Sequence, residues 1–271
     1  MGSDAMMPVV LAATHHDPDG RLYDQTARVL PQLTRIFSGI AIQATHASQP
    51  RALNLLAGAG AMVQQEQTAQ SSSLILLGRA RRNALECALR MDAPVILFCD
   101  FDRVLHWAEC YPNELPHVAR ELATRDFTVL GRTERAFGSH PRIQRDTEAI
   151  VNTVYASVSG RAWDVTAAAR GVSRRAAAAI LAGCDEPSVG TDVAWPLFLQ
   201  RRGGFTIGYC ATEGLEFETA DRYADQVAAA GGLDAWIAQL DADPQRWVER
   251  LEVARAEVAA AVPYRDERLR L

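Results

Sequence analysis

Short apolar runs separated by stretches with helical spacing make up the first hundred residues of the chain. The runs at 9–13, 40–44, 74–77 and 95–99 are typical of strands buried on both faces. Helices are expected between them, from a cap at Asp24 to about Phe37, over 50–65 and over 79–90. Pro31 falls inside the first helix and is expected to interrupt or kink it. Strands alternating with helices predict βαβ units and a largely parallel sheet.

The second half of the chain has a mixed pattern and becomes helical after residue 219. Further strands are expected at 127–131 and 205–209, and helices at roughly 141–159, 173–182 and 191–202. One face of a closing amphipathic helix is marked by Trp247, Leu251, Ala254 and Val258. We therefore predict an α/β domain over residues 7–218 and a helical C-terminal extension over 219–271 that packs on it.

The composition is that of a globular protein, but one residue type is missing. Hydrophobic residues make up 48% of the chain and charged residues 23%. All 28 basic residues are arginine, which excludes a Walker A lysine, a Schiff-base lysine and a kinase-type ATP lysine. The net charge of -5 leaves no basic surplus for nucleic-acid phosphates, so we expect no nucleic-acid partner.

Cysteine usage and apolar run lengths indicate the compartment. The five cysteines form no C-x-x-C pair, which favours reduced, mostly buried thiols. Apolar runs such as 95–98 are far too short to cross a bilayer, and the opening residues lack the pattern of a signal peptide. We expect a cytoplasmic protein without a transmembrane segment, and homo-oligomerisation is left open.

Two aspartates at the end of one expected strand are the first candidates for chemistry. Asp100 and Asp102 are separated by one residue and directly follow the run at 95–99. Two carboxylates in this arrangement can share Mg²⁺ or Mn²⁺ and leave positions open for phosphate oxygens. Taken alone, the same pattern also fits a solvated turn after a strand.

The segment that leads to this pair resembles the central block of glycosyltransferases with the GT-A fold, especially those of family-2 type. In that block an Arg-Asn pair opens a helix, and a hydrophobic strand then ends in D-x-D. The resemblance implies a mixed, mostly parallel, Rossmann-like sheet flanked by helices, and a nucleotide-sugar donor whose diphosphate lies on a cation held by the aspartates. It also implies that Arg79, Arg82 and Asn83 lie beside the nucleotide and its phosphates.

Residues 131–181 resemble the region after D-x-D in dolichyl-phosphate mannose synthases. The corresponding pieces are Gly131-Arg132-Thr133, Arg145 and Asp164-Val165-Thr166. By this resemblance Arg132 reaches the donor's anionic group and Asp164 lines the acceptor pocket. The chain lacks the Ser-Gly-Phe that usually follows and has no apparent membrane anchor, so a small soluble acceptor is expected.

Residues 189–214 resemble the G-x-D, helix, strand block that closes many GT-A catalytic domains, including that of mannosylglycerate synthase. The resemblance assigns Asp192 to the acceptor, as general base in an inverting enzyme or as a positioning group in a retaining one. A helix N-cap is the structural alternative. A metal-binding histidine follows this block in mannosylglycerate synthase, whereas this chain has Glu216-Phe217-Glu218.

The remaining candidates are polar residues at strand ends and scattered histidines. The resemblance assigns Thr14 and His15, at the end of the first strand, to the nucleotide, and His46 is similarly placed after the second strand. Structural or surface roles are expected for His106, His117 and His140, because they lack the spacing of metal ligands.

Together these features predict a Mg²⁺- or Mn²⁺-dependent hexosyltransferase that moves a sugar from a nucleotide-diphosphate donor to a small acceptor. Two alternatives remain. The aspartate pair also resembles the first motif of haloacid-dehalogenase-type phosphatases, with Asp100 as nucleophile and Asp102 as acid/base. That motif normally opens its domain, whereas 99 residues precede it here. The second alternative is a catalytically degenerate GT-A domain that serves as a binding module.

Overall fold

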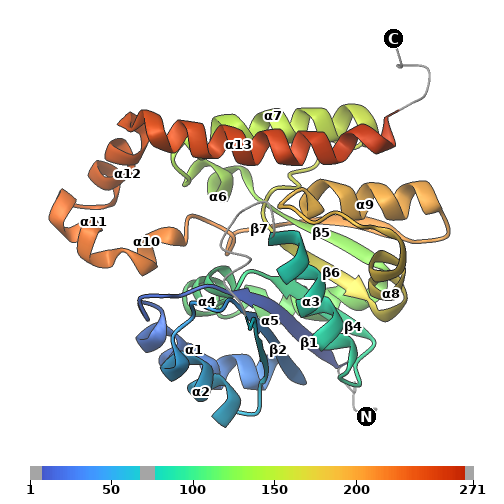
Figure 1. Cartoon of the computed structure of the whole chain (residues 1–271), viewed down its shortest axis with the longest axis horizontal. Coiled ribbons are helices and arrows are strands. Elements are labelled where there is room, and N and C mark those ends of the chain that lie inside the picture. Colours follow the sequence, from blue (N-terminus) through green and yellow to red (C-terminus); the bar gives the residue numbers. More distant parts are fainter. Residues whose placement is uncertain (1–7, 68–76, 266–271) are drawn as a thin grey trace.

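A computed structural model describes residues 8–67 and 77–265 of the chain. Within these ranges seven strands form one sheet in the order β3-β2-β1-β4-β6-β5-β7 (Figure 1). The strands are β1 (Val9–His15), β2 (Gly39–Ala44), β3 (Met62–Gln65), β4 (Val95–Cys99), β5 (Phe127–Arg132), β6 (Ala169–Ser173) and β7 (Ile207–Thr212).

The sheet is parallel except at β6. β1 lies in parallel register between β2 and β4, with Val10 opposite Gly39 on one side and Ile96 on the other. β6 runs antiparallel to both β4 and β5, and β7 is parallel to β5. The carboxyl ends of β1, β2 and β4 therefore meet at one edge, which is where ligands of such sheets usually bind.

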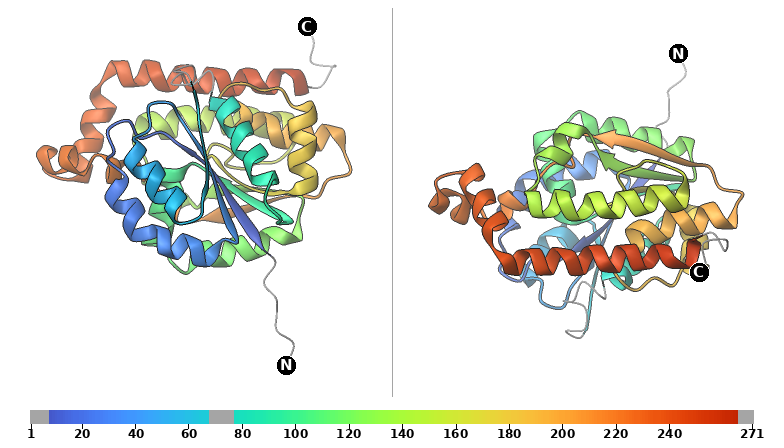
Figure 2. Two further views of the ribbon diagram at one scale, coloured as in Figure 1. Left: turned by 60° about the horizontal axis from the view of Figure 1, so that its bottom comes forward. Right: turned by 90° about the horizontal axis from the view of Figure 1, so that it is seen from above.

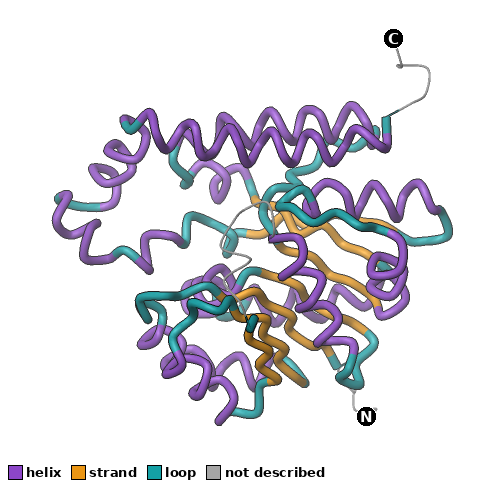
Figure 3. The backbone as a smooth tube through the Cα atoms, in the orientation of Figure 1, coloured by secondary structure: helices purple, strands orange, loops and turns teal. Residues whose placement is uncertain are grey.

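Helices cover both faces of the sheet (Figure 3). Alternate residues of β1 pack into two separate cores, Val9 and Leu11 into one and Val10 and Ala12 into the other. The first core is completed by α1 (Tyr23–Ile36), α2 (Pro50–Gly58), α4 (Phe101–Cys110) and α5 (Glu114–Glu121). The second is completed by α3 (Leu77–Leu89), α7 (Arg142–Ser159), α8 (Arg174–Gly183) and α9 (Thr191–Arg202).

Of the C-terminal helices, α13 (Pro244–Ala261) adds residues to this second core. The short helix α6 (Glu134–Gly138) follows β5. The C-terminal part after β7 consists of α10 (Thr219–Arg222), α11 (Ala224–Ala230), α12 (Leu233–Ala242) and α13. α13 lies alongside α7 in every view (Figures 1 and 2). It also packs on the start of α9, where a Cβ on Gly190 would come within 2.6 Å of the Ala260 Cβ. Glycine at this position therefore permits the close helix approach.

Several sequence-based boundaries need correction. The helix expected over 50–65 ends at Gly58, and the chain turns through Gly60 (φ +88°) into the edge strand β3. Glycine adopts a left-handed φ of this kind without steric strain, so helices commonly end just before a glycine. Of the strand expected at 74–77, residues 74–76 lie outside the described residues, and Leu77 begins α3. Pro31 lies inside α1, which continues to Ile36, so the helix is not interrupted there.

The predicted fold class is confirmed: a mixed, mostly parallel sheet is flanked by helices and followed by a helical C-terminal part. The strand β6 was not anticipated, because Ala-Arg-Gly-Val-Ser carries little apolar signal. The division into domains at residue 218 stays a prediction. None of the helices in the described ranges is long and apolar enough to span a membrane.

Candidate active site

The aspartate pair lies where β4 passes into α4. All five residues of β4 are buried, and at Asp100 the backbone is still extended (φ -63°, ψ 140°) before α4 begins at Phe101. Asp102 therefore lies in the first turn of α4, where the helix dipole favours negative charge. The side chains of Asp100 and Asp102 keep 22% and 27% of their surface exposed, so both remain accessible at the edge of the sheet.

Both oxygens of Asp100 are held by neighbouring side chains. The Thr14 hydroxyl donates to Asp100 Oδ1 at 2.5 Å, and Arg81 Nη2 donates to Oδ2 at 3.3 Å. Thr14 comes from the end of β1 and Arg81 from α3. Asp100 is thus fixed in place from two sides.

Arg81 links Asp100 to a second, buried carboxylate. Its Nη1 lies 3.0 Å from Asp192 Oδ2 in the first turn of α9 and donates to the Thr191 hydroxyl at 2.9 Å. The other oxygen of Asp192 accepts from Arg170 at 3.0 Å. Burial alone would lower the pKa of Arg81, but Asp192 and Asp100 outweigh it and raise that pKa, so the guanidinium stays charged.

Asp102 has a different environment, which includes a residue from the C-terminal helices. Arg222 Nη2, at the end of α10, donates to Asp102 Oδ2 at 2.9 Å. The backbone N–H of Arg103 donates to the other carboxylate oxygen at 3.0 Å. Among the residues that the structure describes, Asp102 therefore contacts one cationic side chain, and this side chain comes from a separate part of the fold.

Two cavities meet at Asp102 and Arg222. The strand-end cavity, of about 300 Å³, is bounded mainly by Thr14, His15, Gln43, Thr45, Asp100 and Asp102. The helix cavity, of about 310 Å³, lies between α7, α10, α12 and α13 and is bounded mainly by Gln144, Phe217, Tyr223, Trp236, Arg246 and Arg250. Asp102 and Arg222 line both. The arrangement can hold two ligands side by side with the carboxylate between them.

Of the two nucleotide-binding candidates on β1, His15 is the more buried. Its ring packs edge-on against Phe101 with centroids 5.2 Å apart, and neither ring nitrogen has a partner in the part of the chain that the structure describes. Burial lowers the pKa of His15 to about 4, so the imidazole is neutral at pH 7. Thr14 and His15 both line the strand-end cavity, whereas His46 is exposed outside it.

The other nucleotide candidates on α3 do not reach this cavity. Arg79 is exposed, and neither it nor Asn83 belongs to the lining of either cavity. Arg82 binds the carbonyl oxygens of Ile180, Leu181 and Cys184 instead and so satisfies the C-terminal end of α8. At their positions along α3, these three residues lie on a different face of the helix from the face that meets the aspartates.

Arg81 is the arginine of α3 that sequence reasoning missed. It lies on the helix face that carries Ala84, Leu85 and Ala88, all of them buried. Residues spaced by three, four and seven share a helix face, so this spacing was the available signal.

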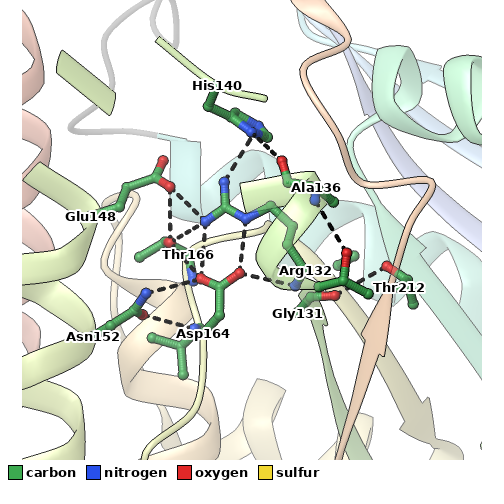
Figure 4. A network of polar contacts seen from close by, with 12 residues as sticks. Gly131, Arg132, Ala136, His140, Glu148, Asn152, Asp164, Thr166 and Thr212 are labelled. Atoms are coloured by element: carbon green, nitrogen blue, oxygen red, sulfur yellow. Dashed lines mark hydrogen bonds and ion pairs between the residues drawn. The ribbon is translucent and has the colours of Figure 1, made fainter. Parts of the chain in front are cut away.

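Arg132 and Asp164 meet in a buried ion cluster (Figure 4). Arg132 donates to Asp164 at 2.8 and 2.9 Å, to Glu148 at 2.6 Å and to the Thr166 hydroxyl at 2.8 Å. Asn152 also donates to Asp164 at 3.0 Å. Burial alone would raise the pKa values of both acids, but Arg132 outweighs it, which leaves Asp164 well below its usual range and Glu148 at about 2. Neither Arg132 nor Asp164 lines either cavity, and each is occupied by the other in this cluster.

The segment after β7 does not complete a metal site with the aspartates. Within residues 8–67 and 77–265, no group of three or more His, Cys, Asp or Glu side chains could hold a metal ion. Glu216 lies 3.2 Å from His106, and Glu218 lies 3.5 Å from Arg103. Burial raises the pKa of Glu218, with Arg103 opposing it. In the described ranges the aspartate pair thus has no third His, Cys, Asp or Glu beside it that would complete a metal site.

No known protein family matches the sequence, and no curated protein sequence matches it. Solved structures do match its fold. This chain has the GT-A fold. Glucosyl-3-phosphoglycerate synthase from Mycobacterium tuberculosis aligns at a TM-score of 0.50 and 13% identity over 83% of this chain and 79% of that one. Its complex with Mn²⁺, UDP and phosphoglyceric acid aligns at 0.50 and 13% over 76% and 68%, and its complex with Mn²⁺, UDP-glucose and phosphoglyceric acid at 0.50 and 13% over 76% and 69%.

The fold also bears on the phosphatase alternative. In the GT-A sheet of this chain the aspartates follow β4, which lies in the middle of the sheet, with β1, β2 and β3 preceding it in sequence. The first motif of a haloacid-dehalogenase-type phosphatase normally opens its domain. This topology argues against that alternative and leaves a GT-A enzyme or a GT-A binding module.

Proposed function

We propose that this GT-A protein is a metal-dependent glycosyltransferase that transfers a sugar from a nucleotide-diphosphate donor to a small acidic acceptor. The observation that carries the proposal is the pair of cavities that share Asp102 and Arg222. One cavity opens at the carboxyl ends of parallel strands, as nucleotide sites do in such sheets. The other lies against the C-terminal helices and offers a separate compartment for the second substrate.

The donor set of the strand-end cavity suits Mg²⁺ or Mn²⁺ bound together with a diphosphate. Such ions are commonly held by one or two carboxylates and completed by substrate phosphate oxygens and water. Asp102 would bind the cation directly, because among the described residues its carboxylate accepts a side-chain hydrogen bond from Arg222 alone. Asp100, whose oxygens are held by Thr14 and Arg81, would bind it directly or through water. When bound, the cation would neutralise charge on the departing diphosphate.

Residues at the strand ends are placed to hold the nucleoside of the donor. Thr14 and His15 come from β1, and Gln43 and Thr45 from the end of β2 and the residue after it. A neutral His15 can either donate or accept a hydrogen bond to a base or ribose. We assign these four residues to donor binding; Arg79, Arg82 and Asn83 do not line this cavity.

Asp192 acts through Arg81 in this proposal. Both of its oxygens bind guanidinium groups, and it lines neither cavity. A carboxylate held in this way would have to release an arginine before it could accept a proton from a substrate. We therefore assign it a positioning role: it holds Arg81, and Arg81 holds Asp100.

The lining of the helix cavity favours an acceptor with an acidic group. Among its described residues are three arginines, Arg222, Arg246 and Arg250, against the carboxylates of Asp102 and Glu249. Phe217 and Trp236 stack at 6.0 Å and supply an apolar wall. The glucosyl-3-phosphoglycerate synthase that shares the fold was solved in complex with Mn²⁺, UDP and phosphoglyceric acid, which supports a small acid as the acceptor. Arginine is well suited to carboxylate and phosphate groups.

In the reaction an acceptor hydroxyl oxygen bonds to the anomeric carbon of the sugar, and the bond from that carbon to the diphosphate breaks. The diphosphate leaves with the electron pair, and the hydroxyl proton is released. This chain's contribution is to place the two substrates on either side of Asp102 and to hold, through its aspartates, the cation that would offset the charge of the leaving group. Positioning of this kind removes much of the entropic barrier to reaction.

Calorimetric titration of the intact chain with UDP and with GDP, each with and without Mn²⁺, tests the proposal. We expect one of the two nucleotides to bind only when Mn²⁺ is present, because Asp100 and Asp102 would hold the cation that offsets the charge of the diphosphate. If neither nucleotide binds in a Mn²⁺-dependent way, the proposed function is wrong. If binding occurs but no donor sugar is transferred or hydrolysed with any acid acceptor, the binding-module alternative is favoured.

Arg250→Gln tests the acceptor compartment. Arg250 Nη2 binds Glu148 at 2.6 Å, while its Nε is buried without a partner in the described part of the chain and can serve a ligand. With Mn²⁺ and UDP present, we expect the wild type to bind 3-phosphoglycerate more tightly than glycerol. We expect Arg250→Gln to lower the affinity for 3-phosphoglycerate by about 10- to 100-fold. The measurement is calorimetric titration. Arg255→Gln, an exposed arginine on α13, is the control, and equal affinities in both variants would contradict the assignment.

A further inference from the structure

Arg222 is the cationic side chain at the boundary between the two cavities. It lines both of them and places Nη2 2.9 Å from Asp102 Oδ2. Its Nε is buried and has no partner among the residues that the structure describes. The guanidinium thus donates to the Asp102 oxygen that, in the proposed function, would bind a divalent cation. Its Nε–H group remains available to donate to a ligand.

Contacts on either side fix the backbone that carries Arg222. Asp221 is bound by His106 at 2.8 Å and by Gln25 at 2.7 Å, which ties α10 to α4 and α1. Tyr223 packs against Trp236 with ring centroids 6.0 Å apart. Because these contacts hold the backbone, the guanidinium can change partners by rotation of the Arg222 side chain.

Positive charge at this position works against a cation that binds alone. A divalent ion on Asp102 would lie beside Arg222 and would either displace it from its ion pair or share the oxygen with it. A bound diphosphate changes this balance, because it brings several anionic oxygens to which a guanidinium can donate. Arg222 can then leave Asp102 to the cation without losing an anionic partner.

We propose that Arg222 is the counterion of Asp102 in the unliganded protein and turns to the donor's diphosphate when cation and donor bind. It thereby makes cation binding depend on donor binding. The inference rests on the proposed function, and it goes beyond that function by giving the segment after β7 a cationic role. The histidine ligand expected there by resemblance is absent, and Arg222 adds positive charge to the leaving group instead of holding the metal.

The two affinities must be linked if this is correct. By thermodynamic linkage, UDP strengthens Mn²⁺ binding by the same factor by which Mn²⁺ strengthens UDP binding. We expect that factor to be on the order of 100 in the wild type. Removal of the competing guanidinium should raise the affinity for Mn²⁺ alone, whereas loss of its contact to the diphosphate should lower the affinity for UDP in the presence of Mn²⁺.

Arg222→Gln separates these effects because it is expected to change the two affinities in opposite directions. With the intact chain, free Mn²⁺ is measured by electron paramagnetic resonance, and UDP binding at saturating Mn²⁺ by calorimetry. We expect Mn²⁺ alone to bind about ten-fold more tightly and UDP about ten-fold more weakly than in the wild type. Arg222→Lys, which retains the charge, should stay near the wild type in its affinity for Mn²⁺ alone.

Arg28→Gln is the matched control, because Arg28 also pairs with a carboxylate of α4, Glu109, at 3.0 Å but lines neither cavity. It should leave both affinities unchanged. If Arg222→Gln weakens Mn²⁺ and UDP alike, or changes neither, the inference is wrong although the proposed function stands. If Arg222→Gln does not fold, Arg222→Lys provides the test. Tighter binding of Mn²⁺ alone by Arg222→Lys than by the wild type would overturn the inference. A wild-type chain that shows no Mn²⁺-dependent UDP or GDP binding would overturn the proposed function and this inference together.

Discussion

Replacement of Asp102 with asparagine is expected to weaken Mn²⁺-dependent binding of UDP by at least about 100-fold. The substitution keeps the shape of the side chain but removes the charge that a divalent cation requires. Asp102 is also the carboxylate shared by the two cavities. Its loss should therefore affect the binding of the donor and, where sugar transfer can be measured, the rate of that transfer.

The measurement is calorimetric titration of UDP at fixed Mn²⁺, and circular dichroism checks that the variant is folded. Asp19→Asn serves as the control, since Asp19 has a side chain 67% exposed and is paired only with Arg21 among the described residues. Wild-type affinity and an unchanged dependence on Mn²⁺ in Asp102→Asn would show that Asp102 does not hold the cation.

Replacement of Arg132 with methionine is expected to reduce the free energy of unfolding by about 3 to 5 kcal/mol. Its guanidinium is completely buried and neutralises Glu148, which is also buried, and Asp164, whose side chain is 11% exposed. Without it, Asp164 keeps only hydrogen bonds from neutral side chains and backbone groups, and Glu148 keeps Arg250. An unpaired carboxylate in such surroundings is costly, because it has lost its water without gaining a counterion.

The pH dependence supplies a second test of the same cluster. Arg132 holds the pKa of Asp164 below its ordinary value despite burial, so this contribution is present above pH 4 and is lost as the pH falls through the folded-state pKa. The difference in stability between wild type and Arg132→Met should thus be largest near neutral pH and shrink below about pH 4. Urea unfolding at several pH values measures it.

Arg135→Gln is the control for Arg132→Met. Arg135 pairs with Glu213 and Glu216, yet half of its side chain is exposed (51%). Water screens such pairs, so we expect a change of at most about 1 kcal/mol. A loss of similar size in both variants would contradict the view that burial gives the Arg132 cluster its weight.

Much of the fold followed from local pattern. The runs at 9–13, 40–44 and 95–99 became β1, β2 and β4, because continuous apolar residues are stable only when both faces of a strand are covered. The edge strand β3 and the antiparallel strand β6 were not predicted. β3 has alternating exposed residues at the margin of the sheet, and β6 is stabilised by its pairing with β4 and β5 rather than by its own composition.

The candidate site was predicted less completely than the fold. Asp100, Asp102, Thr14 and His15 line one cavity, since residues at the carboxyl ends of adjacent parallel strands meet at one edge. Asp192 is tied to Asp100, but through Arg81 rather than across an open pocket. Arg132 and Asp164, both expected at the substrates, neutralise each other in a buried cluster.

The sequence by itself determined where β2 and β4 end, the two aspartates that follow β4 and the absence of lysine chemistry, because each of these depends on neighbouring residues or on composition. Only the tertiary structure decided which cations reach the aspartates. The orientation of α3 about its own axis relative to the sheet places Arg81, and not Arg79 or Arg82, against Asp100. Arg222 lies 120 residues after Asp102 and meets it only because α10 packs beside α4. Contacts between such distant segments depend on how the helices pack, and local sequence pattern contains no record of that packing.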